Sequence, residues 1–272
     1  MKRVVFIFLQ KEFKMYSLGI AFCGGGSKGI AHAGVIKFLN EQKIVPDVLA
    51  GTSAGAIVAS MYAAGKKPEE IVTFFKSVYF FKWNHFALMK PGGFIHSDVF
   101  KKYLNPIFKD MVLDDLDKRV FITATNIVSG KLEVFGGQTK VVDALIASCA
   151  VPMVATPYKI GNDLYNDGGI LNNFPADVLK YVSRKIIGVY FSPQQQVEAS
   201  DLKSMIDVTS RAYDLMTTQA ELGKMTTCDW FINPTELQKY NLFETKQKRM
   251  DEIFQIGYEA AKESYTDTLN IR

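Results

Sequence analysis

Residues 45–62 read VPDVLAGTSAGAIVASMY, which is an apolar run, a turn of small residues and a helical pattern in direct succession. The run at 45–50 predicts a buried strand, and the apolar residues after the turn recur along one face of a helix. Between them, residues 51–55 match the Gly-x-Ser-x-Gly pattern with Ser53 at its centre. A strand-to-helix turn of this kind exposes a serine hydroxyl and surrounds it with backbone N–H groups. The stretch therefore predicts an α/β fold and makes Ser53 a candidate nucleophile, to be judged together with the motifs before and after it.

The same alternation of strand and helix patterns continues along the chain. Apolar runs typical of strands occur at 18–23, 45–50, 120–126, 132–135, 163–166, 186–192 and 229–233. Helical patterns occur at 31–39, 97–109, 141–148, 175–183, 201–223 and 250–268. Strands that alternate with helices predict a mostly parallel sheet covered on both faces. We therefore expect one domain with a three-layer α/β fold, in which helices flank a central, mostly parallel sheet.

Composition agrees with one globular domain and narrows the classes of partner. The chain has 272 residues, of which 48% are hydrophobic and 22% charged, enough to bury a large core. Its net charge of +4 is small and the two signs are interspersed. This balance argues against a nucleic-acid partner but is compatible with an anionic surface. The three cysteines are odd in number and widely spaced, so we predict neither a disulfide framework nor a metal site.

The first residues resemble the start of a leader segment. An apolar run at 4–9 follows basic residues but ends at Gln10, and no small-residue cleavage site follows. That run is shorter than the ~7–15 residues of a signal-peptide core, and no later run reaches the ~18–20 of a membrane span. We therefore expect a cytoplasmic protein that is not secreted and at most touches a membrane peripherally. A second hypothesis is that Met15 is the true start and that 1–14 are an extension outside the domain at 15–272.

A second small-residue segment, GGGSKG, follows the first predicted strand and precedes a helix. Gly24, Gly26 and Gly29 satisfy the Gly-x-Gly-x-x-Gly pattern of dinucleotide-binding proteins, and the downstream Asp47 has the spacing of an acidic ribose partner. Backbone amides at a helix start bind other anions too, including the oxyanion of an acyl transfer. In a doubly wound sheet, the ends of neighbouring strands meet at one crevice, which brings this loop beside Ser53. We favour the oxyanion, with a nucleotide-binding module as the alternative.

The general base must come from a small set of residues. A Ser-acid-His triad of the α/β-hydrolase type runs in that order along the chain, but only two acidic residues separate Ser53 from the last histidine, His96. His32 follows the glycine loop on a helix and is expected to pack, while His85 and His96 are expected on the surface or at caps. A carboxylate is left to accept the proton. Asp167 follows a short strand and precedes two glycines, which allow its backbone to approach another segment closely.

These motifs, in this order, resemble the patatin-like phospholipase family. The segments 29–35 and 147–152 also resemble stretches that the family carries, and the resemblance covers about residues 17–180. It implies a central, mostly parallel sheet between helices and hydrolysis of lipid acyl esters without a metal or other cofactor. It also implies that Ser53 is the nucleophile and Asp167 the general base of a Ser-Asp dyad.

The oxyanion hole that the resemblance implies is formed by backbone N–H groups, contributed by Gly24, Gly25, Gly26 and Ala54. The glycines that support the motifs are Gly29, Gly51, Gly55, Gly168 and Gly169. Cys23 departs from the family pattern, without an expected consequence because this position contributes backbone. Cys149 is expected to be a buried, inert thiol.

The predicted partner is a lipid or another acyl ester. An aromatic stretch at 74–89 is interleaved with lysines, which suits transient contact with a lipid surface. The other interpretation, which we favour, is a helical cap whose aromatic side chains face the core. A third function class is a non-catalytic lipid-binding protein on the same fold, against which the presence of both Ser53 and Asp167 argues. Head group, chain length, acyl acceptor and oligomeric state stay open.

Overall fold

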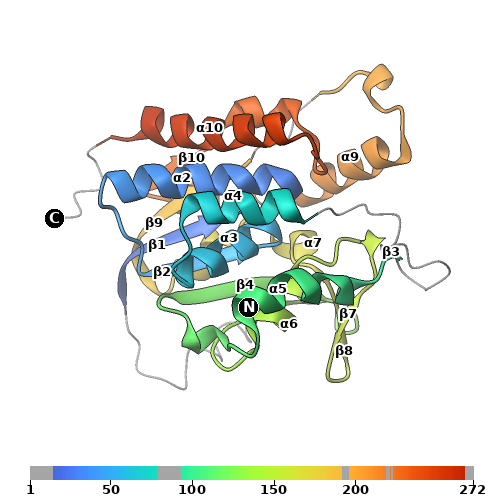
Figure 1. Cartoon of the computed structure of the whole chain (residues 1–272), viewed down its shortest axis with the longest axis horizontal. Coiled ribbons are helices and arrows are strands. Elements are labelled where there is room, and N and C mark those ends of the chain that lie inside the picture. The colour runs from blue at the N-terminus through green and yellow to red at the C-terminus, as the bar shows by residue number, and fades with distance from the viewer. Residues whose placement is uncertain (1–14, 79–92, 192–195, 219–220, 222, 267–272) are drawn as a thin grey trace.

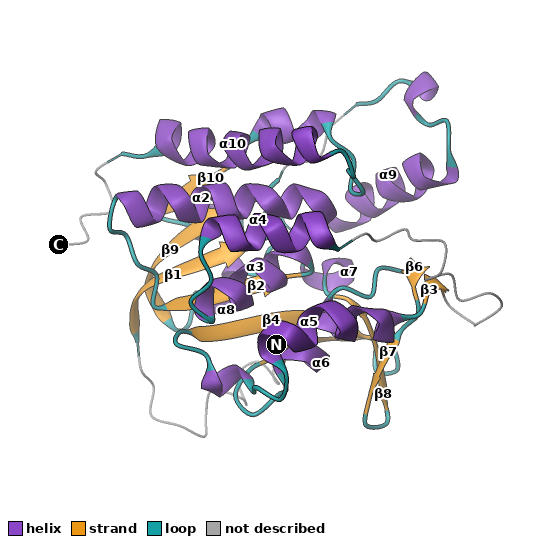
Figure 2. Cartoon of the chain, viewed as in Figure 1, coloured by secondary structure: helices purple, strands orange, loops and turns teal. Residues whose placement is uncertain are grey.

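The computed structural model describes residues 15–78, 93–191, 196–218, 221 and 223–266, which are drawn in colour in Figure 1. Within these ranges an eight-stranded sheet forms the centre of the molecule, and helices flank it (Figures 1 and 2). The predicted α/β fold with a central, mostly parallel sheet is confirmed. Every helix in the described part of the chain is too short or too polar to cross a lipid bilayer.

Five strands form the parallel part of the sheet. In spatial order they are β10 (Trp230–Ile232), β9 (Ser183–Val189), β1 (Tyr16–Phe22), β2 (Val48–Thr52) and β4 (Arg119–Asn126). Strand β2 is buried at all five of its positions. Parallel strands that are covered on both faces consist of continuous apolar runs, which is why their sequence pattern is clear.

The antiparallel part of the sheet extends from β4. Its strands are β5 (Lys131–Phe135), β7 (Tyr158–Ile160) and β8 (Asp163–Asp167). On β4, Thr123 pairs with Thr52 at the end of β2, and Ala124 pairs with Asp167 at the end of β8. Both β4 residues also pair with β5. A strand has two edges, and β5 occupies one edge of β4. Strands β2 and β8 therefore both pair with the other edge. They run in opposite directions along it, so their last residues meet end to end.

Nine α-helices lie within the described residues. They are α2 (Ile30–Glu41), α3 (Ala54–Ala63), α4 (Pro68–Ser77), α5 (Lys101–Phe108), α6 (Val141–Ser148), α7 (Gly169–Asn172), α8 (Ala176–Leu179), α9 (Met205–Thr218) and α10 (Gln247–Ser264). Helices α2, α4 and α10 lie side by side in Figure 1. Glycines allow α2 and α10 to pack closely, since a Cβ on Gly34 would lie 2.1 Å from the carbonyl oxygen of Phe254. A short pair of parallel strands, β3 (Gly93–Ile95) and β6 (Met153–Ala155), lies apart from the main sheet.

Several helix boundaries differ from the prediction. The pattern at 175–183 yields only the four residues of α8, because residues 180–182 turn the chain into β9. The pattern at 97–109 is divided into a 3₁₀ turn and α5, and that at 201–223 shortens to α9. Sequence reasoning missed α4, although Pro68 opens it and Glu70 accepts the backbone N–H of Lys67 at 2.9 Å. Pro at the first turn and a carboxylate at N3 are local signals of a helix start.

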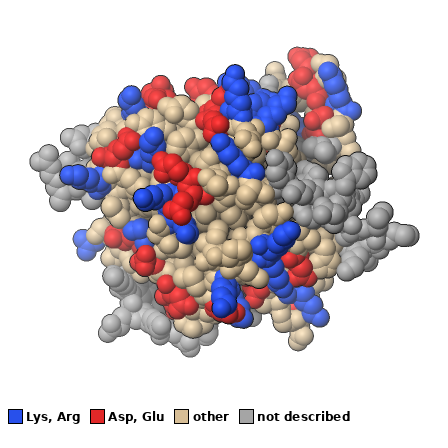
Figure 3. All heavy atoms as spheres, in the orientation of Figure 1, with Lys and Arg blue, Asp and Glu red and all other residues tan. Residues whose placement is uncertain are grey.

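The described part of the aromatic stretch forms a cap over the core. Phe74 and Phe75 are 9% and 2% exposed on α4, and Lys76 forms an ion pair with Asp251 of α10 at 2.5 Å. The interpretation of a cap is therefore correct for the part of the stretch within α4. Residues 79–89 lie outside the described residues, as do residues 1–14. Lysine, arginine and acidic side chains are mixed across the face shown in Figure 3, in agreement with the interspersed charge of the sequence.

Candidate active site

Ser53 lies between the last residue of β2 and the first residue of α3, in a backbone conformation that few non-glycine residues adopt. Its φ and ψ are 53° and −122°, and it is 7% exposed. Such a conformation costs about 1–3 kcal/mol and persists where the surrounding structure enforces it, typically at functional sites. The strand-to-helix turn predicted for Ser53 is present.

Two glycines allow this turn to be tight. A Cβ on Gly55 would lie 2.4 Å from the carbonyl oxygen of Phe22 and 2.5 Å from that of Cys23. A Cβ on Gly51 would lie 2.6 Å from the backbone nitrogen of Ala56. A side chain at either position would push α3 away from the sheet. The glycines of the motif therefore set the direction in which the serine between them points.

The glycine loop packs directly on the Ser53 turn. It continues from the end of β1 into a 3₁₀ turn at Gly26–Gly29. A Cβ on Gly24 would lie 3.3 Å from that of Ser53, and a Cβ on Gly29 would lie 2.6 Å from that of Ala54. The predicted meeting of the two motifs at the ends of neighbouring strands is therefore present in the structure.

The backbone N–H groups around Ser53 differ in whether they already donate a hydrogen bond within the protein. The N–H of Gly24 donates to the carbonyl oxygen of Asn173 at 3.0 Å, so it is not available to an oxyanion, contrary to the sequence prediction. The N–H groups of Gly25 and Gly26 have no hydrogen-bond acceptor among the described residues. Ala54 is the first residue of α3, where the helix itself supplies no acceptor for the N–H. Three of the four predicted donors are thus available.

Asp167 is fully buried at the end of β8. Its Oδ1 accepts the backbone N–H of Gly169 at 2.8 Å. A Cβ on Gly168 would lie 2.4 Å from the carbonyl oxygen of Thr123, so the glycines bring this turn against β4, as the sequence predicted. Because β2 and β8 meet end to end, Asp167 and Ser53 reach the same region from opposite directions.

The last residue of α6 and the segment that follows it contact the two predicted residues. Ser148 Oγ accepts the backbone N–H of Ser53 at 2.8 Å, and the carbonyl oxygen of Ala150 accepts that of Asp167 at 2.9 Å. Burial raises the pKa of the Cys149 thiol well above its usual value. The charge of Asp167 raises this pKa further, and a hydrogen bond between the side chains of Cys149 and Ser53 opposes the rise. Cys149 is therefore a buried, protonated thiol, as predicted, and it touches the serine.

The histidines take supporting positions. The buried His32 donates from Nε2 to the carbonyl oxygen of Cys23 at 2.8 Å and stacks on Phe191 with ring centroids 4.3 Å apart. Burial lowers the pKa of His32 to about 3, so the ring is neutral and packs at the end of β1, as predicted. His96 accepts a backbone N–H at a 3₁₀ N-cap, also as predicted, and His85 lies outside the described residues.

The position of Asp47 contradicts the dinucleotide fingerprint. Asp47 precedes β2, and its Oδ2 accepts the backbone N–H of Leu18, near the beginning of β1. The glycine loop follows the other end of β1, so Asp47 cannot bind a ribose whose phosphates lie on that loop. A Cβ on Gly26 would lie 2.2 Å from the carbonyl oxygen of Leu242. A glycine is therefore required at position 26 because the protein's own backbone lies close to it, and no nucleotide is needed to explain it.

A narrow pocket opens beside Ser53. Its walls come from the glycine loop, α3, the turn before α5, the loop after α6, strand β6 and the loop before α10. Its lining residues are Gly25, Gly26, Ser53, Ala54, Ile57, Phe100, Cys149, Val151, Val154, Ala155, Leu242 and Phe243. These side chains are mostly apolar. The cavity volume is about 40 Å³, roughly three times the ~10–15 Å³ that a cavity needs on this measure to hold one water molecule. The pocket suits the first carbons of an acyl chain.

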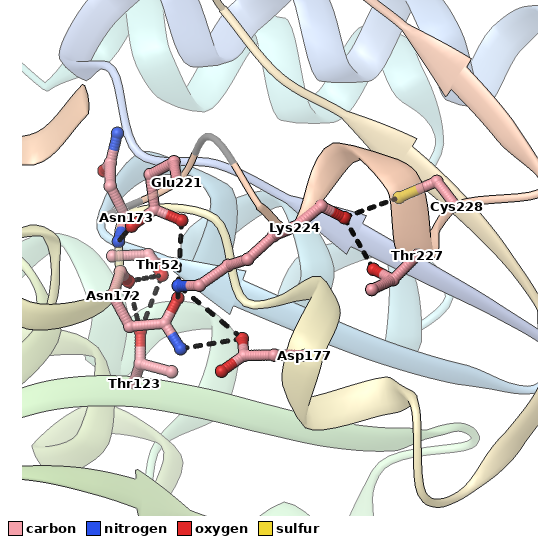
Figure 4. Close-up of polar contacts among 9 residues, drawn as sticks. All are labelled: Thr52, Thr123, Asn172, Asn173, Asp177, Glu221, Lys224, Thr227 and Cys228. Carbon is pink, nitrogen blue, oxygen red and sulfur yellow. Dashed lines mark hydrogen bonds and ion pairs between the residues drawn. The ribbon is translucent and has the colours of Figure 1, made fainter. Parts of the chain in front are cut away.

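A polar network includes Thr52, the residue before Ser53 (Figure 4). Thr52 Oγ1 donates to the carbonyl oxygen of Asn172 at 2.8 Å. Lys224 Nζ donates to Oδ1 of Asn172 at 2.7 Å and pairs with Oε2 of Glu221 at 2.8 Å. Glu221 Oε1 accepts the backbone N–H of Asn173 at 2.8 Å. The network therefore connects the C-terminal third of the chain to the turn after β8 and to the residue before Ser53.

We expect Glu221→Ala to destabilise the protein by about 3 kcal/mol, because it removes the buried carboxylate that pairs with the Lys224 ammonium and accepts the Asn173 N–H. For a chain of this size, the melting temperature should fall by about 6–12 °C. Glu221→Gln retains an acceptor oxygen and should lose less. Thermal unfolding measures these effects, with the exposed Glu236→Ala as the matched control. A Glu221→Ala melting temperature equal to that of this control would contradict the role of the network.

Sequence reasoning missed several residues of this site. Ser148 lies in a segment noted for its family resemblance, but its contact with Ser53 came from the structure. Glu221 and Lys224 lie in the last third, where the sequence carries no recognised motif. Leu242 and Phe243 are ordinary apolar residues in the sequence, and only the path of the chain places them in the pocket.

A family model described as patatin-like phospholipase matches residues 20–180. The match covers more than half of the chain and includes the Ser53 turn, the glycine loop and Asp167. This chain belongs to the patatin-like phospholipase family. The resemblance stated from the motifs is thereby confirmed.

Two relatives of this chain are much longer than it is. An uncharacterized NTE family protein of Mycobacterium tuberculosis is 28% identical over 179 residues, covering 63% of this chain and 29% of that protein. Human patatin-like phospholipase domain-containing protein 6 is 25% identical over 280 residues, covering 90% of this chain and 20% of that protein. The chain thus spans less than a third of the length of these two relatives.

A solved structure extends the likeness past the family match. The crystal structure of VipD from Legionella pneumophila superposes with a TM-score of 0.63 at 14% identity, covering 97% of this chain and 72% of that one. At this identity the likeness shows a shared fold. The last third, which the family model does not match, therefore belongs to the same fold as the motif-bearing part.

Proposed function

We propose that this chain hydrolyses acyl esters of lipids, with Ser53 as nucleophile and Asp167 as general base. The observation that carries the proposal is the strained Ser53 turn, which lines an apolar pocket next to the glycine loop. The meeting of β2 and β8 supports the pairing of these two residues. Membership of the patatin-like phospholipase family supports the class of substrate.

In the proposed reaction, Ser53 Oγ attacks the ester carbonyl carbon while its proton passes to the carboxylate of Asp167. The carbonyl oxygen becomes an oxyanion, which the N–H groups of Gly25, Gly26 and Ala54 stabilise. The tetrahedral intermediate collapses, the bond to the alcohol oxygen breaks, and Asp167 returns the proton to that oxygen. A water molecule then attacks the acyl-serine with the same base, which releases the fatty acid and restores Ser53.

Backbone donors and a buried carboxylate suit this reaction. The available amides are held by turns that glycine alone permits, so they need not reorganise as charge develops on the oxygen. The thiol of Cys149 is protonated and does not compete with Ser53 as a nucleophile. Apolar walls on the pocket favour an acyl chain over a polar group.

The proposal is tested by incubating the purified chain with a panel of phospholipids, lysophospholipids and acylglycerols and measuring released fatty acid by mass spectrometry. A fluorophosphonate probe is applied in parallel, and the labelled peptide is mapped. We expect fatty acid release from at least one lipid class and labelling at Ser53 alone. Absence of both would favour a non-catalytic lipid-binding protein. Stabilisation by NAD, FAD or ATP in a thermal-shift assay would instead support the nucleotide-binding alternative.

A further inference from the structure

A loop from the C-terminal third lies directly on the glycine loop. This loop, residues 240–244, connects a 3₁₀ turn to α10 and is called the 240–244 segment. Ser27 holds it by hydrogen bonds from both its backbone and its side chain. The backbone N–H and the Oγ of Ser27 both donate to the carbonyl oxygen of Leu242, at 2.9 and 3.0 Å. The backbone N–H of Glu244 donates to the same Oγ at 2.8 Å.

The 240–244 segment is also fixed at its other end. Oε1 of Glu244 accepts the backbone N–H groups of Thr245 and Lys246, each at 3.0 Å, and Oε2 pairs with Arg249 at 2.9 Å. Glu244 is itself buried, so these contacts join the segment to the start of α10. The segment is therefore held between the glycine loop and α10 in one position.

Holding the segment in this position places two of its side chains in the pocket of Ser53. Leu242, which is buried, and the half-buried Phe243 form one wall. Ile57 and Phe100 contribute to the rest of the lining. The cavity left between the walls is about 40 Å³. A longer acyl chain must therefore displace these side chains or leave through the mouth of the pocket.

We propose that Leu242 and Phe243 limit the acyl-chain length that the site accepts. The inference rests on the proposed function, since the chain in question is that of an ester whose carbonyl carbon lies at Ser53. The backbone of the segment is fixed by Ser27 and Glu244. The size of the two apolar side chains then sets the depth of the pocket.

The test compares kcat/KM for p-nitrophenyl acetate and p-nitrophenyl octanoate in the wild type and in variants of the full chain. We expect the octanoate-to-acetate ratio to rise about tenfold or more in Leu242→Ala and in Phe243→Ala, since a few methylenes in an apolar pocket change kcat/KM by at least this factor. Phe243→Trp should lower the ratio. Thr245→Ala, an exposed change next to the segment, is the matched control and should leave it unchanged.

Each outcome separates this inference from the proposed function. Variants that fold and are labelled at Ser53, but keep a ratio within about twofold of wild type, would overturn the role of the two side chains. A wild type that hydrolyses neither ester and is not labelled would overturn the proposed function and this inference together. If Leu242→Ala does not fold, Phe243→Ala and Phe243→Trp decide the test. These two variants of a half-buried residue are expected to shift the octanoate-to-acetate ratio in opposite directions.

Discussion

Replacing Ser53 by alanine should reduce ester hydrolysis by roughly 10⁴-fold or more in kcat, because the proposed reaction has no other nucleophile. The side chain of Cys149 touches Ser53, but its raised pKa keeps it protonated, so it should not substitute for the serine. Labelling by a fluorophosphonate probe should disappear in the same variant. Hydrolysis of p-nitrophenyl butyrate and gel-based labelling measure the two effects.

A second serine on the same helix provides the control for this variant. Ser60 is a fully buried residue of α3, and its side chain does not line the pocket. Ser60→Ala should therefore retain hydrolysis and labelling. Circular dichroism and thermal unfolding check that both variants fold. Hydrolysis by folded Ser53→Ala at the wild-type rate would remove this serine from the mechanism.

We expect Asp167→Asn to lower kcat by roughly 10³–10⁴-fold, since a neutral amide cannot take the proton from Ser53. The substitution is close to isosteric, and the amide oxygen can still accept the N–H of Gly169. The fold should therefore survive, and labelling at Ser53 should become slower without changing its position. Steady-state hydrolysis and the time course of labelling distinguish this result from a loss of structure.

Asp163 allows the same chemical change on the same strand. It is the first residue of β8, is half-buried, and lies at the opposite end of the strand from Asp167. Asp163→Asn should keep both activities within about twofold, as expected for a change away from the reacting groups. Equal activity of the Asn variants at the two positions would contradict the proposed role of Asp167 as the base.

Local signals in the sequence were sufficient for much of the site. At positions 51 and 55 a Cβ atom would lie only 2.4–2.6 Å from other backbone atoms, so only glycine fits. The motif in the sequence therefore reports the close packing of this turn. The order of strand and helix patterns predicted the sheet because buried parallel strands are continuously apolar. His32 was correctly assigned to packing, since it follows the glycine loop on a buried helix.

Other expectations failed where spacing along the chain was taken for position in space. Asp47 has the right distance in sequence for a ribose partner but lies at the wrong end of β2. Gly24 belongs to the glycine loop, yet its N–H donates to the carbonyl oxygen of Asn173, the residue after α7. The helix expected at 175–183 is short because the chain must enter β9 at Ser183. In each case a tertiary contact overrode a local pattern.

By itself the sequence determined the family, the α/β class and the two residues proposed for catalysis, because tight turns and buried strands restrict residue types locally. Tertiary structure alone decided how the ends of β2 and β8 meet and which amides are available. It also decided that Leu242 and Phe243, far along the chain, close the pocket. These features depend on contacts between segments that are distant in sequence. The residues next to an apolar or acidic side chain do not indicate which distant residue it will contact.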